Sequence, residues 1–300
     1  MTAPAFGLPG GWRLWASVTR PHILSIIFAS TITYGWIFRG QHTWDLLVIA
    51  LIAVWDWFIV NWTNKATDLE EDLANGIVGA AEVAAHKRVV EGLGWAMMLG
   101  GLLAGFWLHP EMLPLRVSFT LVGILYNYNV LGFKRLKERY FFKNFGSSIL
   151  FTHSVFLYPL FGQGLEHTYP LPALLLSILF FLPLELTYEI MYDLRDYEGD
   201  RKLGVPTFPV AHGPARAKHI LYGLLLFSAV WPLVGAATGL LRLREWVVVA
   251  GVIQQFALMR LYAPGARHPT ARECIALTYW GTGQLVSYNL WIAVGLPLGP

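Results

Sequence analysis

Long blocks of mostly apolar residues alternate with short polar segments along the whole chain. Each block is about as long as the roughly 20 residues that an α-helix needs to cross the hydrocarbon core of a membrane. The blocks lack the strict apolar–polar alternation of a membrane β-barrel strand. The pattern therefore predicts nine membrane-spanning helices, at 22–38, 44–63, 92–108, 112–131, 145–163, 170–192, 218–240, 246–263 and 275–297.

The composition supports an integral membrane protein. The 300 residues are 55% hydrophobic and only 14% charged, with a mean hydropathy of +0.49, whereas a soluble domain carries about 25% charged residues. No polar stretch is long enough to form a separate unit, so we predict one all-α domain over residues 1–300. The single Cys274 excludes an internal disulfide. The net charge of +3 is too small to indicate a nucleic-acid partner.

The distribution of Lys and Arg predicts the orientation, because positive charge gathers on the cytoplasmic side of membrane helices. With nine spans and a cytoplasmic N-terminus, 18 of the 22 Lys and Arg residues fall on the inner side and four on the outer side. We therefore expect a multi-pass protein of the cell inner membrane. Both acidic stretches described next then lie on the cytoplasmic side.

Two acidic stretches follow the second and sixth apolar blocks: "NKATDLEED" at 64–72 and "DLRDYEGDRKLG" at 193–204. A helical rotation of about 100° per residue places the polar residues of each stretch on one face: Asn64, Asp68 and Asp72 in the first, and Asp193, Asp196 and Asp200 in the second. Two facing stripes of carboxylates repel each other unless a cation lies between them, and Mg²⁺ prefers such oxygen ligands.

Basic residues accompany the acidic stretches, in "GFKRLKER" at 132–139 and directly after Asp200. Carboxylates, Mg²⁺ and Lys or Arg side chains together form a diphosphate site. The alternative interpretation is a solvated acidic rim beside a basic loop that only sets the topology.

The two stretches resemble the N-x-x-x-D-x-x-x-D and D-x-x-D-x-x-x-D motifs of the UbiA superfamily of intramembrane prenyltransferases. The second motif, with its "EGDRKLG" extension, is most similar to the branches that act on chlorophyllide, homogentisate or archaeal glyceryl lipids. "TRPH" at 19–22 resembles the start of the family's first helix, and "LYNYNVLGFKR" at 125–135 its Tyr-to-Lys loop. The resemblance covers nearly the whole chain. Lys65 departs from it, because the family commonly has Asp after the Asn of the first motif.

The resemblance implies Mg²⁺ as the cofactor and a role for each motif residue. The residues implied in catalysis and metal binding are Asp68, Asp72, Asp193, Asp196 and Asp200. Those implied in binding the substrate are Asn64, Arg20, Tyr126, Lys134, Arg201 and Glu189.

Carboxyl groups inside predicted spans are by default functional candidates. For Glu189, one helical turn before Asp193, we favour contact with the substrate. For Glu185 we favour a hydrogen bond between helices. Asp56 fits two roles equally well, either lining the same cavity or bonding to Trp or Tyr neighbours.

We therefore expect transfer of a polyprenyl group from a prenyl diphosphate to a hydrophobic acceptor, which is aromatic, quinone-like or a lipid, within the membrane. One alternative is a terpene cyclase that ionises the same substrate. Another, from a different class, is a cation-coupled transporter. A transporter predicts charged residues along a path near the middle of the bilayer, whereas here most acidic residues lie at one end of the helices.

Overall fold

The computed structural model describes residues 18–130, 132–163, 170–240, 253, 256 and 267–295, and in these ranges it contains helices and no strand. The helices are α2 (Pro21–Arg39), α3 (Trp44–Thr67), α4 (Leu69–Ala74), α5 (Ala80–Ala85), α6 (Lys87–Leu108), η1 (Pro110–Met112), α7 (Leu113–Asn127), η2 (Leu136–Glu138), α8 (Tyr140–Thr152), the π-helical turn η3 (His153–Leu157), α9 (Tyr158–Gly162), α10 (Leu171–Leu203), α11 (Phe208–His212), α12 (Pro214–Ala237) and α14 (Ala271–Ala293).

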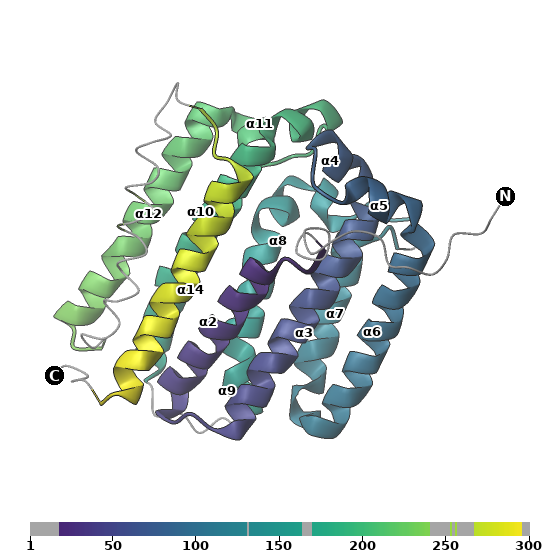
Figure 1. Ribbon diagram of the computed structural model, residues 1–300. Coiled ribbons are helices and arrows are strands. Elements are labelled where there is room, and N and C mark those ends of the chain that lie inside the picture. The colour runs from purple at the N-terminus through teal and green to yellow at the C-terminus, as the bar shows by residue number, and fades with distance from the viewer. Residues whose placement is uncertain are drawn as a thin grey trace.

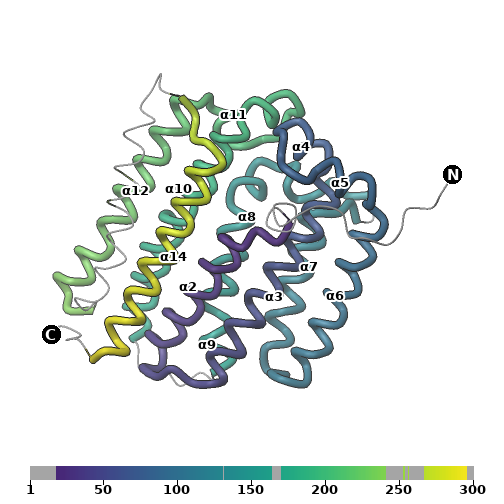
Figure 2. Tube along the Cα trace, viewed as in Figure 1, coloured from purple at the N-terminus to yellow at the C-terminus, as the bar shows by residue number. Residues whose placement is uncertain are grey.

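The long helices lie side by side in one bundle (Figure 1). Helix α10 packs against α8, α12 and α14, while α3 packs against α2, α6 and α7. Helices α2 and α14, from opposite ends of the chain, are neighbours (Figure 2). The short helices α4, α5 and α11 gather at one end of the bundle. The acidic stretches, at the C-terminal ends of α3 and α10, reach this same end.

Eight of the nine predicted spans coincide with helical segments, and the remaining one, 246–263, lies outside the described residues except at positions 253 and 256. Among the described helices, five are long and apolar enough to cross a membrane: α2, α3, α6, α10 and α12. Helix α7 has only 15 residues, and the predicted span at 145–163 is divided among α8, η3 and α9. The count of nine spans and the cytoplasmic N-terminus therefore stay predictions.

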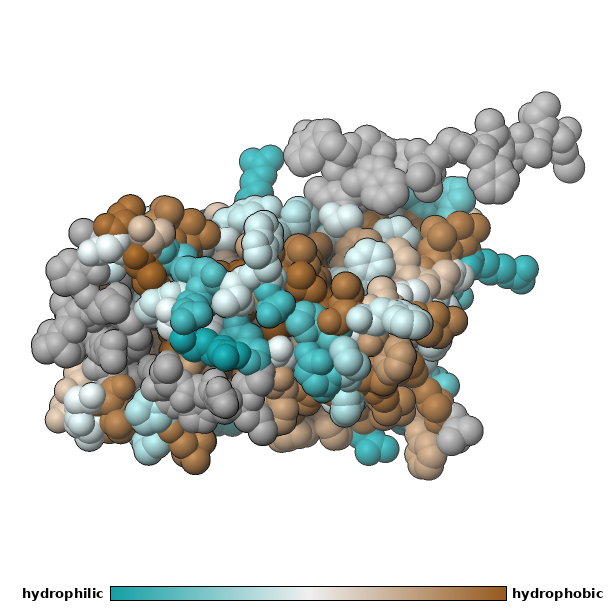
Figure 3. Space-filling model, turned by 90° about the horizontal axis from the view of Figure 1, so that it is seen from below, coloured by the Kyte–Doolittle hydropathy of each residue, from teal (hydrophilic) through white to brown (hydrophobic). Residues whose placement is uncertain are grey.

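Apolar side chains cover much of the outside of the bundle. Large exposed examples on α6 and α12 include Leu103, Trp107, Leu226 and Leu233. Figure 3, which views the bundle from the end opposite α4 and α5, shows hydrophilic residues across the middle of that end and hydrophobic residues around much of its periphery. Apolar surface of this extent is typical of contact with lipid.

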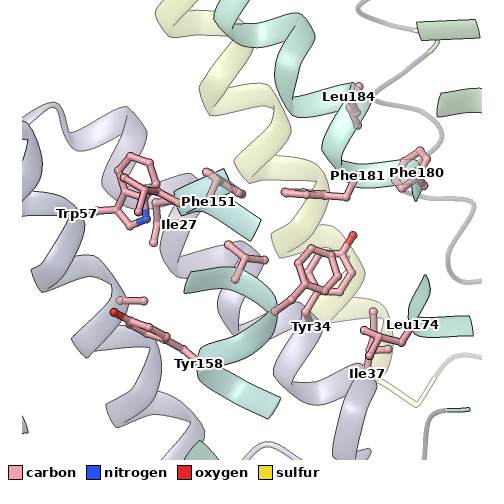
Figure 4. Close-up of a cluster of buried hydrophobic side chains, with 14 of the residues drawn as sticks. Ile27, Tyr34, Ile37, Trp57, Phe151, Tyr158, Leu174, Phe180, Phe181 and Leu184 are labelled. Carbon is pink, nitrogen blue, oxygen red and sulfur yellow. The ribbon is translucent and has the colours of Figure 1, made fainter. Parts of the chain in front are cut away.

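Aromatic and aliphatic side chains fill the interior between α2, α3, α8 and α10 (Figure 4). The rings of Tyr34 and Phe156 lie 4.2 Å apart between centroids, and Phe181 meets both. Trp57 donates a hydrogen bond from its indole nitrogen to the Ser154 hydroxyl at 2.8 Å. This packing holds the helices that carry the acidic stretches.

One ion pair lies buried between α3 and α7. Arg116 donates to both carboxylate oxygens of Asp56, at 2.7 and 3.0 Å, and also to the carbonyl oxygen of Gly101 at 2.7 Å. The Tyr158 hydroxyl donates to Asp56 at 2.8 Å. Gly105 leaves space for the Arg116 side chain, because a Cβ at residue 105 would lie 1.5 Å from an Arg116 nitrogen. Of the two roles that the sequence left open for Asp56, the structure supports bonding to its neighbours.

The predicted topology has a direct test. A reporter fused after Pro300 is expected outside the cytoplasm, and one inserted within 135–140 inside it, because the positive residues of that loop favour the cytoplasmic side. Protease protection or alkaline phosphatase activity of the fusions measures this. A cytoplasmic C-terminus would mean an even number of spans.

Candidate active site

A cavity of about 1140 Å³ lies inside the bundle, lined by residues of α2, α3, α7, α8, α10 and α14. Charged residues of both acidic stretches line it at the α4 end of the bundle. Farther along the helices its lining is aromatic and aliphatic and includes Trp57, Phe151 and Phe181, which Figure 4 shows in the apolar interior. The volume is slightly above the roughly 300–1,000 Å³ of typical small-molecule sites. A ligand with a charged head and a long apolar tail suits both parts.

The first acidic stretch does not form one continuous helix. Helix α3 ends at Thr67, Asp68 has φ −102° and ψ 22°, and α4 begins at Leu69. The expectation that its three polar residues share one regular helix is therefore wrong. The Thr67 hydroxyl bonds back to the carbonyl oxygens of Thr63 and Asn64, and such bonds bend helices. Asn64, Asp68 and Asp72 nevertheless all line the cavity.

The second acidic stretch lies on one unbroken helix, as predicted. Helix α10 continues to Leu203 and ends at Gly204, whose φ of 69° is the left-handed conformation that caps many helices. Asp193, Asp196 and Asp200 all line the cavity. The shared helical face predicted for these three carboxylates is confirmed.

The two acidic stretches meet at the end of the bundle. Asn75, directly after α4, donates its side-chain amide to Asp200 at 3.2 Å. Gly199 permits this approach, since a Cβ there would lie 2.0 Å from the Asn75 side-chain oxygen. Segments that are far apart in the sequence thus line one cavity, which is the arrangement expected from their charge pattern.

Each motif carboxylate has a cationic or amide partner in this structure. The pairs are Lys137 with Asp68, Lys65 with Asp72 at 2.7 Å, Lys143 with Asp193 at 3.6 Å, Arg195 with Asp196 and Asn75 with Asp200. Lys137 also bonds to Glu71 at 2.8 Å. Basic side chains therefore balance the repulsion between the two stripes of carboxylates.

The basic residues at the cavity differ in part from those implied by the resemblance. Lys134 is exposed and does not line the cavity, whereas Lys137, three residues later on the turn η2, is buried there. Arg201 is exposed and pairs with Glu198 at 3.0 Å. The resemblance implied no role for Lys143. A lone Lys next to the apolar block at 145–163 was nevertheless a usable signal of a functional residue.

Lys65 has a clear structural role where the family commonly has Asp. Its side chain is only 4% exposed and its ammonium is bonded to Asp72. This ion pair links the end of α3 to the middle of α4. Lys65 also lines the cavity.

Arg20 lies in an unusual backbone conformation at the start of α2. Its φ of 47° is in the left-handed region, which is uncommon for residues other than Gly and is further disfavoured before Pro21. Its guanidinium donates to the Asn61 side chain at 3.3 Å and lines the cavity. Strained residues gather at functional sites. Tyr126 and Glu189 line the cavity as well.

Arg135 covers the outer edge of the first stretch. Its guanidinium pairs with Glu138 at 2.7 Å and with Asp68 and Glu71 at 3.5 Å each. Burial alone would lower the pKa of Arg135, but its hydrogen bond to Glu138 and the nearby carboxylates raise that pKa above its ordinary value. The group therefore stays charged and adds positive potential beside Asp68.

The oxygen donors of the cavity fit Mg²⁺. Within the described ranges, no three His, Cys, Asp or Glu side chains are close enough to form a complete protein metal site. Mg²⁺ does not need one, because it usually binds through one or two carboxylates together with water and substrate phosphates. The side-chain oxygen of Asn64 is buried, belongs to a cavity residue and has no hydrogen-bond partner among the described residues. Such an orphaned oxygen is suited to a ligand or an ion.

Solved structures resemble this fold over nearly the whole chain. A UbiA homolog from Archaeoglobus fulgidus bound to DMAPP and Mg²⁺ has 15% sequence identity and a TM-score of 0.73, covering 94% of this chain and 99% of that one. A UbiA homolog from Aeropyrum pernix K1 has 16% identity and a TM-score of 0.69, covering 92% and 98%. A structure concerned with digeranylgeranylglyceryl phosphate synthase has 17% identity and a TM-score of 0.58, covering 94% and 97%.

At these identities the structural likeness establishes the fold alone. No curated protein sequence matches the chain. A family model described as the UbiA prenyltransferase family matches residues 81–282, a range that includes the second acidic stretch and begins after the first. Because this match covers about two thirds of the sequence, and because the described helices include five apolar enough to span a membrane, the chain is an integral membrane protein that belongs to the UbiA prenyltransferase family.

Proposed function

We propose that residues 1–300 form one Mg²⁺-dependent prenyltransferase with its active site on the cytoplasmic side of the membrane. It moves a polyprenyl group from a prenyl diphosphate to a hydrophobic acceptor. One observation carries this proposal: both acidic stretches and several basic side chains line a single cavity that continues into an apolar interior. Two similar Archaeoglobus fulgidus structures hold DMAPP or GPP together with Mg²⁺, which supports the same cofactor here.

The two acidic stretches divide the metal–diphosphate site between them. Asn64, Asp68 and Asp72 would hold the ion from one side, and Asp193, Asp196 and Asp200 from the other. When bound, Mg²⁺ supplies positive charge to the diphosphate oxygens. The ammonium groups that pair with these carboxylates would neutralise the diphosphate oxygens. The residues concerned are Lys65, Lys137 and Lys143.

The reaction breaks the bond between the first carbon of the prenyl chain and the diphosphate oxygen, and the bonding electron pair leaves with the diphosphate. A new bond forms from that carbon to the acceptor, which loses a proton. Preorganised cationic groups stabilise the charge that grows on the departing diphosphate. The prenyl chain would extend toward Trp57, Phe151 and Phe181, whose rings line the apolar part of the cavity. Aromatic faces also attract a developing carbocation. Tyr126 and Glu189, between the two parts of the cavity, would contact the substrate.

The buried charges support a transporter less well than a transferase. Asp56 and Arg116, deep between α3 and α7, are bonded to each other, and neither lines the cavity. Such a pair holds helices together and offers no open path for an ion. Most of the acidic residues that line the cavity belong to the two acidic stretches at its charged end.

The test is incubation of the purified protein in lipid bilayers with prenyl diphosphates of several lengths, membrane lipid extract and Mg²⁺. We expect diphosphate release that requires Mg²⁺, and acceptor molecules heavier by one prenyl group in mass spectrometry. Absence of release would contradict the proposal and favour a transporter. Release with only a cyclised hydrocarbon as product would identify a terpene cyclase.

Two lysine variants in the same assay test the site itself. Lys137→Met is expected to lower kcat/KM for the prenyl diphosphate at least about tenfold, equal to about 1.4 kcal/mol of barrier. Lys134→Met, in the same loop but exposed, is the matched control and should stay within about twofold of the unaltered protein. Equal losses in the two variants would contradict the placement of Lys137 at the diphosphate.

A further inference from the structure

Three aromatic rings close the apolar end of the cavity. They are Trp57 on α3, Phe151 on α8 and Phe181 on α10 (Figure 4), and we name these three residues the aromatic floor. Among the described residues of these helices, none that lies farther from the charged end lines the cavity. The ring centroids of Phe151 and Phe181 lie 5.2 Å apart, and those of Trp57 and Phe151 6.0 Å apart. The three rings therefore pack as one layer.

A second aromatic layer supports the aromatic floor from the side away from the cavity. Tyr34 on α2 and Phe156 in η3 both contact Phe181, each with its ring centroid 5.5 Å from that of Phe181. Both are buried, and neither lines the cavity. The hydrogen bond to Ser154 fixes the ring of Trp57. The floor rings can move aside only by displacing packed side chains, which a close-packed interior resists.

The side wall of the cavity between α2 and α14 is closed by direct contact. The hydroxyl oxygens of Ser25 on α2 and Thr282 on α14 lie 3.1 Å apart and share a hydrogen bond. Their sequence neighbours Ile26 and Gly281 line the cavity. A Cβ on Gly281 would lie 3.3 Å from the Ile26 side chain, so the two helices touch at this level. An apolar chain that enters from the charged end is therefore directed toward the aromatic floor.

The depth of the cavity can be compared with the length of a prenyl chain. Phe181 precedes Asp193 by twelve residues on α10, which is roughly 18 Å along the helix axis. An extended prenyl chain gains about 5 Å for each isoprene unit, because each unit adds four backbone bonds. Three or four units therefore span about 15–20 Å and fill the distance from the motif carboxylates to the floor. Nine units span about 45 Å and cannot lie straight within it.

We infer that the aromatic floor limits the length of the prenyl chain, and that the protein selects prenyl diphosphates of three or four isoprene units over long polyprenyl diphosphates. This inference rests on the proposed prenyl transfer, because it requires the diphosphate at the motif carboxylates. Each unit that fits above the floor buries apolar surface and strengthens binding. A unit beyond the floor must displace packed rings, which is unfavourable. Phe181, which contacts both Phe151 and the second aromatic layer, is the specificity-determining residue.

A series of prenyl thiolodiphosphates with two, three, four, five and nine isoprene units tests the length limit. Sulfur in place of the bridging oxygen slows cleavage, so binding is measured without an acceptor. Isothermal titration calorimetry with Mg²⁺ and the full chain in nanodiscs gives the Kd of each probe, and empty nanodiscs correct for partition into lipid. We expect the tightest binding at three or four units, and binding at least about tenfold weaker at nine.

Variants at the floor should move the length limit in opposite directions. Phe181→Leu removes a ring from the floor and should improve binding of the five-unit probe relative to the three-unit probe at least about fivefold. Leu184→Phe adds a ring to a residue that lines the cavity one helical turn nearer the charged end, and it should shift the tightest binding to a shorter chain. Phe180→Leu is the matched control, because Phe180 is buried on the same helix but does not line the cavity. It should leave the order of affinities unchanged.

Thermal unfolding in detergent shows which variants are folded, and Leu184→Phe carries the test by itself if Phe181→Leu does not fold. Three results would overturn the inference and leave the proposed function in place. These are equal affinity of the unaltered protein for four and nine units, tightest binding at nine units, or the same order of affinities in every folded floor variant as in Phe180→Leu. Failure of the unaltered protein to bind a probe of any length with Mg²⁺ would instead reject the proposed function.

Discussion

Replacing Asp68 by Asn is expected to lower kcat/KM for the prenyl diphosphate at least about a hundredfold, which corresponds to roughly 3 kcal/mol of barrier. The change keeps the size of the side chain but removes a charged oxygen from the turn between α3 and α4. That oxygen lines the cavity and is the partner of Lys137 and Arg135. Asp196→Asn, on α10, should cause a similar loss because it removes a carboxylate from the opposite stretch.

Initial rates of diphosphate release over a Mg²⁺ titration measure the effect. Both variants should need more Mg²⁺ for half-maximal rate, since a carboxylate binds this ion more strongly than an amide does. Glu82→Gln, on α5 and outside the cavity lining, should behave like the unaltered protein. Full activity in both Asp variants would reject the metal site and support a solvated acidic rim.

Replacing Asp56 by Leu is expected to destabilise the protein by about 3–5 kcal/mol, because it leaves the Arg116 charge buried without a counterion. Arg116 is 1% exposed, so water cannot easily replace the lost carboxylate. Exchanging both residues for Leu should recover most of the loss, since a buried pair can be replaced by apolar side chains at little cost. Unfolding of the purified protein in detergent, followed by circular dichroism, measures these free energies.

The double variant should also keep most of its prenyltransferase activity, because neither Asp56 nor Arg116 lines the cavity. The control is Lys87→Ala, which breaks the exposed pair of Lys87 and Glu91, 3.8 Å apart, and should cost less than about 1 kcal/mol. A double variant as unstable as Asp56→Leu alone would show that the shape of this contact matters more than its charge.

Local sequence patterns predicted the helical segments well. Apolar block length indicated eight spans that fall on the helical segments now described, because a backbone in lipid must satisfy its hydrogen bonds within each segment. The common face of Asp193, Asp196 and Asp200 was also predictable, since α10 runs unbroken through all three. The same reasoning failed at Asp68, where hydrogen bonds of Thr67 and the ion pair with Lys137 accompany a break in the helix.

The sequence by itself determined a helical membrane protein with two acidic stretches, because apolar length and residue chemistry are properties of each segment alone. Only the tertiary structure decided which basic side chain meets which carboxylate. Lys137, and not Lys134, bonds to Asp68, although the two residues are 69 positions apart in the sequence. Asp56 bonds to Arg116, 60 positions away, and does not line the cavity. Such pairings depend on how helices pack and where a loop turns, and segment-by-segment patterns carry no record of either.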